Sequence, residues 1–251
     1  MDLRELQSSK LVLIGNVWDV NSATLVEELA YDAIGTSSAA IARSFGYKDG
    51  EDLPFELTLT LVKRIRECTS KPLTVDIEWG YGDTPVEIAK NIKLLSDLGV
   101  SGVNIEDSVV LEGQRQLVAA DKFKDKLQQI NNELIKLNVD VFINVRIDTY
   151  LLSEEAPLQQ TLERISQYEM AGAEGVFVPY LVCPNEVSKV LSHTKLPLNL
   201  LSHKEMCSVN ELQEMGVRRL SMGNRLYEKT SIYSESLFKS VLEQQCYSTV
   251  A

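Results

Sequence analysis

The sequence predicts an α/β fold, a single (β/α)8 barrel of the TIM type that spans residues 1–251. Eight short apolar runs alternate with helical segments, and no linker between them is long enough to separate two domains. A doubly wound open sheet is the alternative, but no G-x-G-x-x-G motif opens the first helix. Three helix-to-strand junctions also share one pattern, a glycine between two apolar residues: Leu98-Gly99-Val100, Ala171-Gly172-Ala173 and Met215-Gly216-Val217.

The predicted strands are short and mostly apolar, as expected for strands that are buried on both faces of a barrel wall. The third strand begins at Leu73 and ends with two acidic residues, Asp76 and Glu78. The remaining strands are expected at 10–16, 32–38, 102–106, 140–146, 174–179, 196–201 and 219–222.

The helices are predicted from apolar spacing and from start signals. Thr84-Pro85-Val86-Glu87 and Ser208-Val209-Asn210-Glu211 both have the form of a capping box. Residues 39–53 combine a helical turn with a loop rich in glycine and aspartate. Other helices are expected at 22–30, from 54 onward, 117–138, 157–171, 184–193 and 224–246.

The formal net charge of −11 argues against nucleic acid or an anionic membrane as a partner, although a local pocket can still bind a small anion. No apolar run has the length of a membrane span, and the first residues lack the layout of a signal peptide. The four cysteines include no C-x-x-C pair, so we expect reduced thiols in a cytoplasmic protein. With two histidines in the chain, a His-based zinc site or a Ser-His-Asp triad is disfavoured.

In a barrel, catalytic residues gather where the strands end. Asp76 and Glu78 are two positions apart, so on a strand their side chains should point to the same side. Two buried carboxylates repel each other, and a divalent cation or a fixed arginine relieves the repulsion. The alternative is a solvated strand end with two surface acids.

Further polar residues are expected on the same face. Glu106 and Arg146 end the fourth and fifth strands, and three carboxylates opposed by an arginine suit Mg²⁺. Arginine can form two hydrogen bonds with a carboxylate or phosphonate, and it can stabilise a developing enolate. The alternative for Arg146 is an ion pair that only neutralises the three carboxylates. Asp49 lies in the glycine-rich loop, where a solvated turn aspartate is the simpler interpretation. The remaining strand ends carry Asn16, Ser37, Ser38, Pro179 and Tyr180.

Six motifs stand in order along nearly the whole chain: Asn16–Ser22, Ile34–Ala39, Phe45–Gly50, Asp76–Gly82, Val103–Asp107 and Asn144–Asp148. Together they resemble the isocitrate lyase/phosphoenolpyruvate mutase superfamily. The resemblance implies a barrel that binds Mg²⁺, or Mn²⁺ in its place, and a small 2-oxo or 2-hydroxy carboxylic acid. It also implies a reaction that makes or breaks a C–C or C–P bond next to a pyruvate-type enolate.

The resemblance also assigns roles to the acids. Asp76 matches the acid that contacts the metal most directly, and Glu78 and Glu106 match acids that hold it largely through water. Glu106 is also predicted to be catalytic, together with Arg146.

For the substrate, the resemblance implies binding by Ser37, Ser38, Asp49 and Arg146. Ser37 and Ser38 match a turn whose backbone N–H groups hold the substrate carboxylate. Asp49 matches an acid that supports the metal shell, and Arg146 matches the arginine on the substrate oxygens.

The loop after the fourth strand, Asp107–Gln116, departs from the family. Isocitrate and methylisocitrate lyases carry a Lys-Lys-Cys-Gly-His type motif there, and mutases and phosphonopyruvate hydrolases carry Lys and Asn. This loop is shorter and has no cysteine or lysine to deliver a proton. Pro179-Tyr180 also stands where many relatives have histidine.

The leading interpretation is a magnesium-dependent lyase that forms a pyruvate-type enolate, by retro-aldol cleavage or by decarboxylation of an oxaloacetate-like acid. Decarboxylation suits the short loop, because loss of carbon dioxide needs no protein acid at the leaving group. One alternative is a C–P mutase or hydrolase in which Arg115 stands in for the missing Lys and Asn. Another is a barrel that binds a metabolite without turning it over.

The resemblance further implies a homo-oligomer, a dimer or tetramer, in which the last helix is exchanged between neighbours. Leu237, Val241 and Leu242 on that helix suit such an exchange and suit packing on the helix's own barrel equally well.

Overall fold

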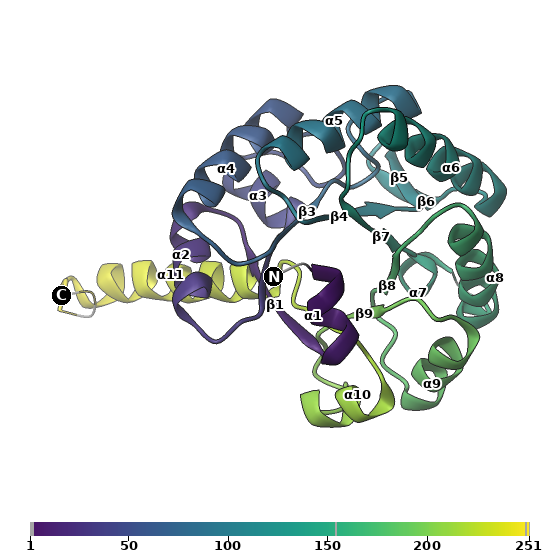
Figure 1. Cartoon of the computed structure of the whole chain (residues 1–251). Helices are drawn as coiled ribbons and strands as arrows, with labels where there is room; N and C mark the ends of the chain where they lie inside the picture. The colour runs from purple at the N-terminus through teal and green to yellow at the C-terminus, as the bar shows by residue number, and fades with distance from the viewer. Residues whose placement is uncertain (1–2, 154, 249, 251) are drawn as a thin grey trace.

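The computed structural model describes residues 3–153, 155–248 and 250. Eight parallel strands close into a barrel that is surrounded by helices (Figure 1), which confirms the predicted TIM-type fold. The barrel strands are β1 (Val12–Val17), β2 (Ala33–Thr36), β3 (Leu73–Asp76), β4 (Gly102–Glu106), β7 (Phe142–Arg146), β8 (Gly175–Val178), β9 (Leu198–Leu201) and β10 (Arg219–Ser221). Each pairs with the next in this order, and β10 pairs with β1 to close the barrel.

The helices begin and end largely where the sequence signals predict. Both predicted capping boxes form, at Thr84 with Glu87 and at Ser208 with Glu211. The helices are α1 (Leu3–Ser9), α2 (Val20–Glu28), α3 (Ser38–Ser44), α4 (Phe55–Cys68), α5 (Pro85–Asp97), α6 (Ala120–Lys136), α7 (Thr149–Leu152), α8 (Pro157–Met170), α9 (Pro184–His193), α10 (Val209–Met215) and α11 (Arg225–Gln244).

The three glycines of the repeated junctions have left-handed backbones. Their φ angles are +84° at Gly99, +94° at Gly172 and +103° at Gly216. This conformation ends a helix and costs glycine little, because glycine has no Cβ. The repeated pattern therefore marks the point where α5, α8 and α10 each turn toward the next strand.

The amino-terminal helix α1 was not predicted from the sequence, and it covers one end of the barrel. Its Leu3 is fully buried and packs with Val12, Ala33 and Phe142, which begin β1, β2 and β7. These strand starts define the amino-terminal end of the barrel, so α1 closes the end opposite to the carboxyl ends of the strands (Figure 1).

The short loop after β4 is a β-hairpin rather than an irregular loop. Strands β5 (Ser108–Leu111) and β6 (Gln114–Leu117) pair antiparallel, and Leu111 lies opposite Gln114. The two residues between them, Glu112 and Gly113, have φ angles of +52° and +77°. Positive φ at both positions is the pattern of a type I′ turn, whose twist matches that of the paired strands.

Helix α11 extends away from the barrel, as Figure 1 shows. Its first turn contacts the barrel, where Tyr227 packs edge-on against Trp18 with ring centroids 5.3 Å apart. No side chain of α11 is buried, and large apolar groups such as Phe238 and Leu242 are exposed. Exchange of this helix between subunits, and the homo-oligomer itself, stay predictions.

Within the described residues, no helix has both the length and the apolar character needed to cross a bilayer. The four cysteines, Cys68, Cys183, Cys207 and Cys246, are free thiols, as the sequence predicted.

The aromatic packing under the barrel wall predicts a large stability loss on truncation. Phe123 of α6 is fully buried between Trp79 and Tyr168, with ring centroids 5.7 Å and 4.9 Å away. Phe123→Ala should lower the free energy of unfolding by about 3–5 kcal/mol in urea titrations, because it removes apolar burial and leaves a cavity. Phe45 is 46% exposed, so Phe45→Ala is the matched control and should cost far less. Equal losses in the two variants would contradict this packing.

Candidate active site

A cavity of about 270 Å³ lies at the carboxyl ends of the barrel strands. It collects most of the residues predicted to form the site, although they come from distant parts of the sequence. The predicted residues that line it are Asn16, Ser37, Ser38, Asp49, Asp76, Arg146, Pro179 and Tyr180. Arg115 lines it as well, whereas Glu78 and Glu106 line a neighbouring cavity of about 200 Å³.

Asp76 is the last residue of β3 and faces the larger cavity. Its Oδ2 accepts a hydrogen bond of 2.7 Å from the Ser38 hydroxyl, and its backbone N–H donates to Thr36 Oγ1 at 3.0 Å. Burial raises the pKa of the Asp76 carboxyl, and the nearby Arg146 guanidinium opposes that shift. Asp76 is thus a fixed, partly charge-compensated carboxylate at the centre of the predicted site.

The expected strand alternation fails just beyond Asp76, so the prediction that Asp76 and Glu78 share one side of a strand is wrong. Strand β3 ends at Asp76, and Glu78 has a left-handed backbone with φ +49°. This turn directs the Glu78 carboxylate to donors outside the main cavity. Its Oε2 accepts from the N–H groups of Gly50 at 2.7 Å and Glu51 at 2.9 Å, and its Oε1 accepts from the Tyr81 hydroxyl at 2.7 Å.

Glu106 ends β4 and lies between two arginines. Its Oε2 is 3.0 Å from Arg146 Nη1, and its Oε1 contacts Arg115 Nη1. The side chain is only 2% exposed, and burial is the largest influence that raises its pKa. The two guanidinium groups oppose this shift, so Glu106 forms the centre of a buried ion-pair cluster.

Arg146 is the last residue of β7, and a neighbouring acid fixes the orientation of its side chain. Its Nε donates to Asp148 Oδ1 at 2.7 Å, and Asp148 is fully buried. Burial lowers the pKa of Arg146, but the charges of Asp148, Glu106 and Asp76 outweigh burial and raise it. Asp148 follows Arg146 by two residues, but nothing in the sequence alone predicts that it holds the arginine.

Arg115 extends from β6 of the hairpin into the main cavity. Besides Glu106, its guanidinium donates to the Ser108 hydroxyl at 3.0 Å and to Asp49 Oδ2 at 2.9 Å. These contacts join the hairpin to β4 and to the loop that carries Asp49. The structure therefore brings to the site the arginine that the C–P alternative requires in place of the family's Lys and Asn.

Ser37 and Ser38 stand where β2 passes into α3. Ser37 is the N-cap of α3, and its hydroxyl accepts from the Ala40 N–H at 3.4 Å. The first N–H groups of a helix have no partner within the helix. Since Ser38 and Ala39 line the cavity, this turn is suited to an anionic group, as predicted for the substrate carboxylate.

The donor set suits a magnesium ion that keeps much of its water. Among the described residues, no three His, Cys, Asp or Glu side chains are grouped closely enough to hold one ion together. Mg²⁺ is usually bound by one or two carboxylates, with water and substrate completing its shell. Asp76 fits a direct ligand in the cavity, whereas Glu78 and Glu106 line the neighbouring cavity and their carboxylates already contact protein donors. The metal roles of all three acids stay predictions.

The environment of Glu78 predicts a dependence of stability on pH. Burial, followed by the charges of Asp49 and Asp76, raises the pKa of Glu78 from its usual 4.5 to about 7. Between these values the folded protein holds a proton that the unfolded chain has released, so the free energy of unfolding should fall as pH rises. Urea titrations in chelator across this interval should show a weaker pH dependence for Glu78→Gln than for wild type.

In that experiment, Glu56→Gln is the matched control, because Glu56 is exposed on α4. It should keep the wild-type pH dependence. Identical pH profiles for wild type and Glu78→Gln would show that Glu78 does not titrate in this way.

The comparisons with known proteins agree with the fold and the motifs. The family model of phosphoenolpyruvate phosphomutase matches residues 3–242. The crystal structure of a proposed phosphonomutase from Burkholderia cenocepacia J2315 is 33% identical, with a TM-score of 0.86, and the match covers 94% of this chain and 97% of that chain. The 2-methylisocitrate lyase of Escherichia coli is 29% identical over 68% of this chain and 58% of its own length.

The oxaloacetate decarboxylase of Paraburkholderia xenovorans is 25% identical over 88% of this chain and 75% of its own length. These relatives include a carbon–carbon lyase and a decarboxylase. The chain belongs to the phosphoenolpyruvate phosphomutase family, within the isocitrate lyase/phosphoenolpyruvate mutase superfamily of lyases and mutases.

Proposed function

We propose that this protein is a magnesium-dependent lyase that forms a pyruvate-type enolate from a small 2-oxo or 2-hydroxy carboxylic acid by C–C cleavage. Decarboxylation of an oxaloacetate-like diacid is the favoured reaction. The observation that carries the proposal is the meeting of Asp76, the start of α3 and Arg146 in one cavity. These groups offer a metal ligand, an anion-binding turn and a fixed cation side by side. The lyase and decarboxylase among the relatives support the same chemistry.

The substrate carboxylate would bind at the start of α3, where Ser38 and Ala39 line the cavity and the first helical N–H groups have no partner within the helix. When bound beside Asp76, Mg²⁺ would supply a Lewis acid that polarises the 2-oxo group of the substrate. The Ser38 hydroxyl donates to Asp76 and holds its carboxylate toward the cavity.

Arg146 would stabilise the negative charge that develops on the enolate oxygen. Its guanidinium is fixed on two sides, by Asp148 at 2.7 Å and by Glu106 at 3.0 Å. A donor that is already oriented needs no reorganisation as the charge develops, and this is the usual source of electrostatic catalysis. Glu106 thereby acts by positioning Arg146.

The hairpin favours decarboxylation over retro-aldol cleavage. It contributes Arg115 to the cavity, and a guanidinium stays protonated and cannot serve as a general acid. In decarboxylation, the bond to the leaving carboxylate breaks and its electron pair forms the enolate, while carbon dioxide departs. Water then protonates the enolate carbon to give the 2-oxo acid. No protein acid is required at the leaving group.

A phosphonate C–P mutase or hydrolase is the second candidate. The specific observation in its favour is that two guanidinium groups, Arg115 and Arg146, line the same cavity. Arginine matches the geometry of phosphonate oxygens, and two arginines could hold a dianionic group from both sides. A barrel that binds a metabolite without turnover is the third candidate, and a turnover measurement separates it from the other two.

Pyruvate release tests the proposal directly. Purified protein should release pyruvate from oxaloacetate in the presence of Mg²⁺ and lose this activity in chelator, with methylisocitrate and phosphonopyruvate assayed in parallel. Asp76→Ala should lose roughly 100-fold or more of the activity, because it removes the carboxylate proposed as the direct metal ligand. The variant is essential, since Mg²⁺ alone decarboxylates oxaloacetate slowly.

Asp97→Ala, which removes an exposed acid of α5, is the matched control and should keep wild-type activity. Pyruvate release from phosphonopyruvate alone would favour a C–P hydrolase. A mutase would form phosphoenolpyruvate from phosphonopyruvate without releasing pyruvate, so phosphoenolpyruvate is measured as well. No product from any of the three acids would count against the proposed lyase and favour the binding-only interpretation.

Substitution of Arg115 distinguishes a decarboxylase from a C–P mutase or hydrolase. For a decarboxylase, Arg115→Gln should lower kcat/KM by no more than about tenfold, because Glu106 retains its contact with Arg146. For C–P chemistry, loss of a guanidinium that holds the phosphonate should cost about 100-fold or more. Steady-state kinetics on oxaloacetate and phosphonopyruvate measure both effects, and Arg64→Gln on the exposed face of α4 serves as the control.

A further inference from the structure

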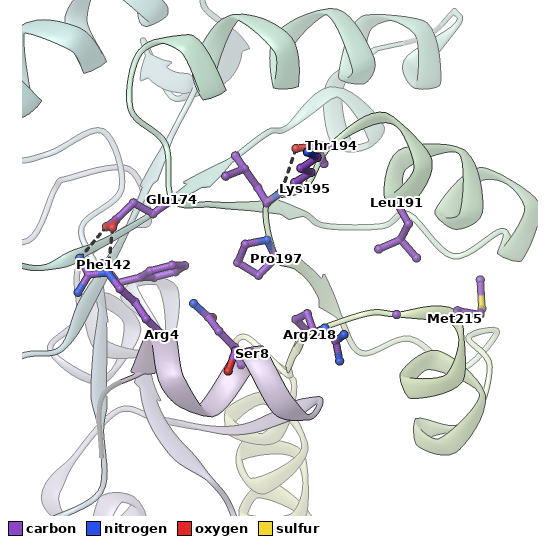
Figure 2. A pocket seen from close by; sticks show the side chains of 13 residues that line it. Arg4, Ser8, Phe142, Glu174, Leu191, Thr194, Lys195, Pro197, Met215 and Arg218 are labelled. Carbon is purple, nitrogen blue, oxygen red and sulfur yellow. Dashed lines mark hydrogen bonds and ion pairs between the residues drawn. The ribbon is translucent and has the colours of Figure 1, made fainter.

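A second and larger cavity lies at the opposite end of the barrel. This groove has a volume of about 570 Å³ and is formed by α1, the start of β7 and the segments that precede β9 and β10 (Figure 2). Arg4 and Ser8 lie along one side on α1, and Arg218 lies across from them, just before β10. Lys195 lines it as well, from the segment after α9.

The groove carries positive charge that protein carboxylates do not balance. Glu174 is the acid in its wall, and Arg4 Nε already binds it at 2.9 Å. Neither Lys195 nor Arg218 makes a side-chain hydrogen bond or ion pair with any residue that the structure describes. An unbalanced basic groove is unexpected in a chain of net charge −11, and it favours an anionic ligand.

A fourth cation, after Arg4, Lys195 and Arg218, lies directly behind the wall of the groove. Arg219 is fully buried, and its Nη1 donates to Gln7 Oε1 at 3.3 Å while its Nε donates to Asn199 Oδ1 at 3.1 Å. Its guanidinium lies 5.1 Å from the centre of the Phe142 ring. Gln7 and Phe142 both line the groove, so Arg219 is separated from it by a single layer of side chains.

Arg219 is also incompletely paired. Its Nη2 is buried with no hydrogen-bond acceptor, and no carboxylate of the described residues forms an ion pair with it. Buried arginines are normally paired with an acid or fully hydrogen-bonded, because an uncompensated buried charge is destabilising. Here the neighbouring groups are two neutral amides and an aromatic face. The positive potential of Arg219 is therefore available to a negative charge in the groove.

We propose that this groove is a binding site for a small organic anion that carries more than one negative charge, as phosphate esters and polycarboxylates do. Arg218 and Lys195 contact the anionic groups, and Arg219 strengthens binding from behind Gln7. The uncharged part of the ligand lies against the apolar lining, which Leu191, Leu196 and Met215 provide. The site is at the far end of the barrel from Asp76, so it is independent of the proposed function.

Calorimetric titration of the full chain with inorganic pyrophosphate and with citrate, in chelator at low ionic strength, tests this site. The tighter of the two probes identifies the preferred anionic group. The double variant Lys195→Gln/Arg218→Gln should bind that probe at least about tenfold more weakly, because each lost cation removes a charge-assisted contact. Lys63→Gln/Arg64→Gln on α4 removes the same net charge elsewhere and should keep wild-type affinity.

Three results would overturn the proposal. They are failure of both probes to bind wild type, equal losses in the two double variants, and loss of binding in Arg115→Gln, which would place the anion in the other cavity. Arg115→Gln should otherwise bind the probe as wild type does.

A single substitution tests the contribution of Arg219 to anion binding. Gln7→Glu puts a carboxylate where the neutral amide now accepts from Arg219 Nη1. It should raise the Tm of the free protein and reduce the Tm increase produced by pyrophosphate to less than half of the wild-type increase. An unchanged Tm together with an unchanged response to pyrophosphate would show that Arg219 does not contribute to the site.

Discussion

The arrangement of the catalytic face depends on the burial of Arg146 among carboxylates. This guanidinium ion lies between Asp148 and Glu106, and both acids are almost inaccessible to water. Breaking a buried ion pair by removing one partner typically costs about 3–5 kcal/mol, because the other charge remains buried and uncompensated. Arg146 therefore fixes the positions of the strand ends that surround it, and its own orientation is fixed in return.

A second buried pair supports the first from outside the barrel. Asp107 Oδ1 accepts from the Asp148 N–H at 2.9 Å, while its Oδ2 accepts from Arg164 at 2.8 Å and from the Tyr168 hydroxyl at 2.9 Å. Since Arg164 and Tyr168 belong to α8, the cavity is connected to the outer helices through hydrogen bonds as well as through apolar packing. Residues that never touch a substrate can thus change the geometry around Arg146.

Much of the barrel could be predicted because its signals are local. Alternation of apolar runs, capping boxes such as Thr84 with Glu87, and glycines such as Gly99 each depend on a few neighbouring residues. Helix α1 was missed because it is short and is stabilised by contacts with strand starts far along the chain. The hairpin was missed although Glu112-Gly113 is a turn sequence, because strands of four residues give little periodicity.

The sequence predicted which residues form the site better than it predicted how their side chains are oriented. Position at a strand end was enough to bring Asp76, Ser38 and Arg146 together. It could not show that the backbone turns to a left-handed conformation at Glu78, because that conformation is held by N–H groups of the loop at Gly50 and Glu51. Such a contact joins residues nearly thirty positions apart and leaves no periodic pattern in the sequence.

The closed turn of the hairpin has a stereochemical consequence. Strands β5 and β6 are joined by only two residues, and β5 is docked on the opposite loop, where a Cβ on Gly50 would lie 2.5 Å from Val110 Cγ2. The cavity beside this hairpin stays open to solvent, because Asp49 and Tyr180, which line it, remain partly exposed. For the proposed lyase, the enolate would then take its proton from bulk water on either face. A product methyl group formed from isotopically chiral substrate would carry no fixed handedness.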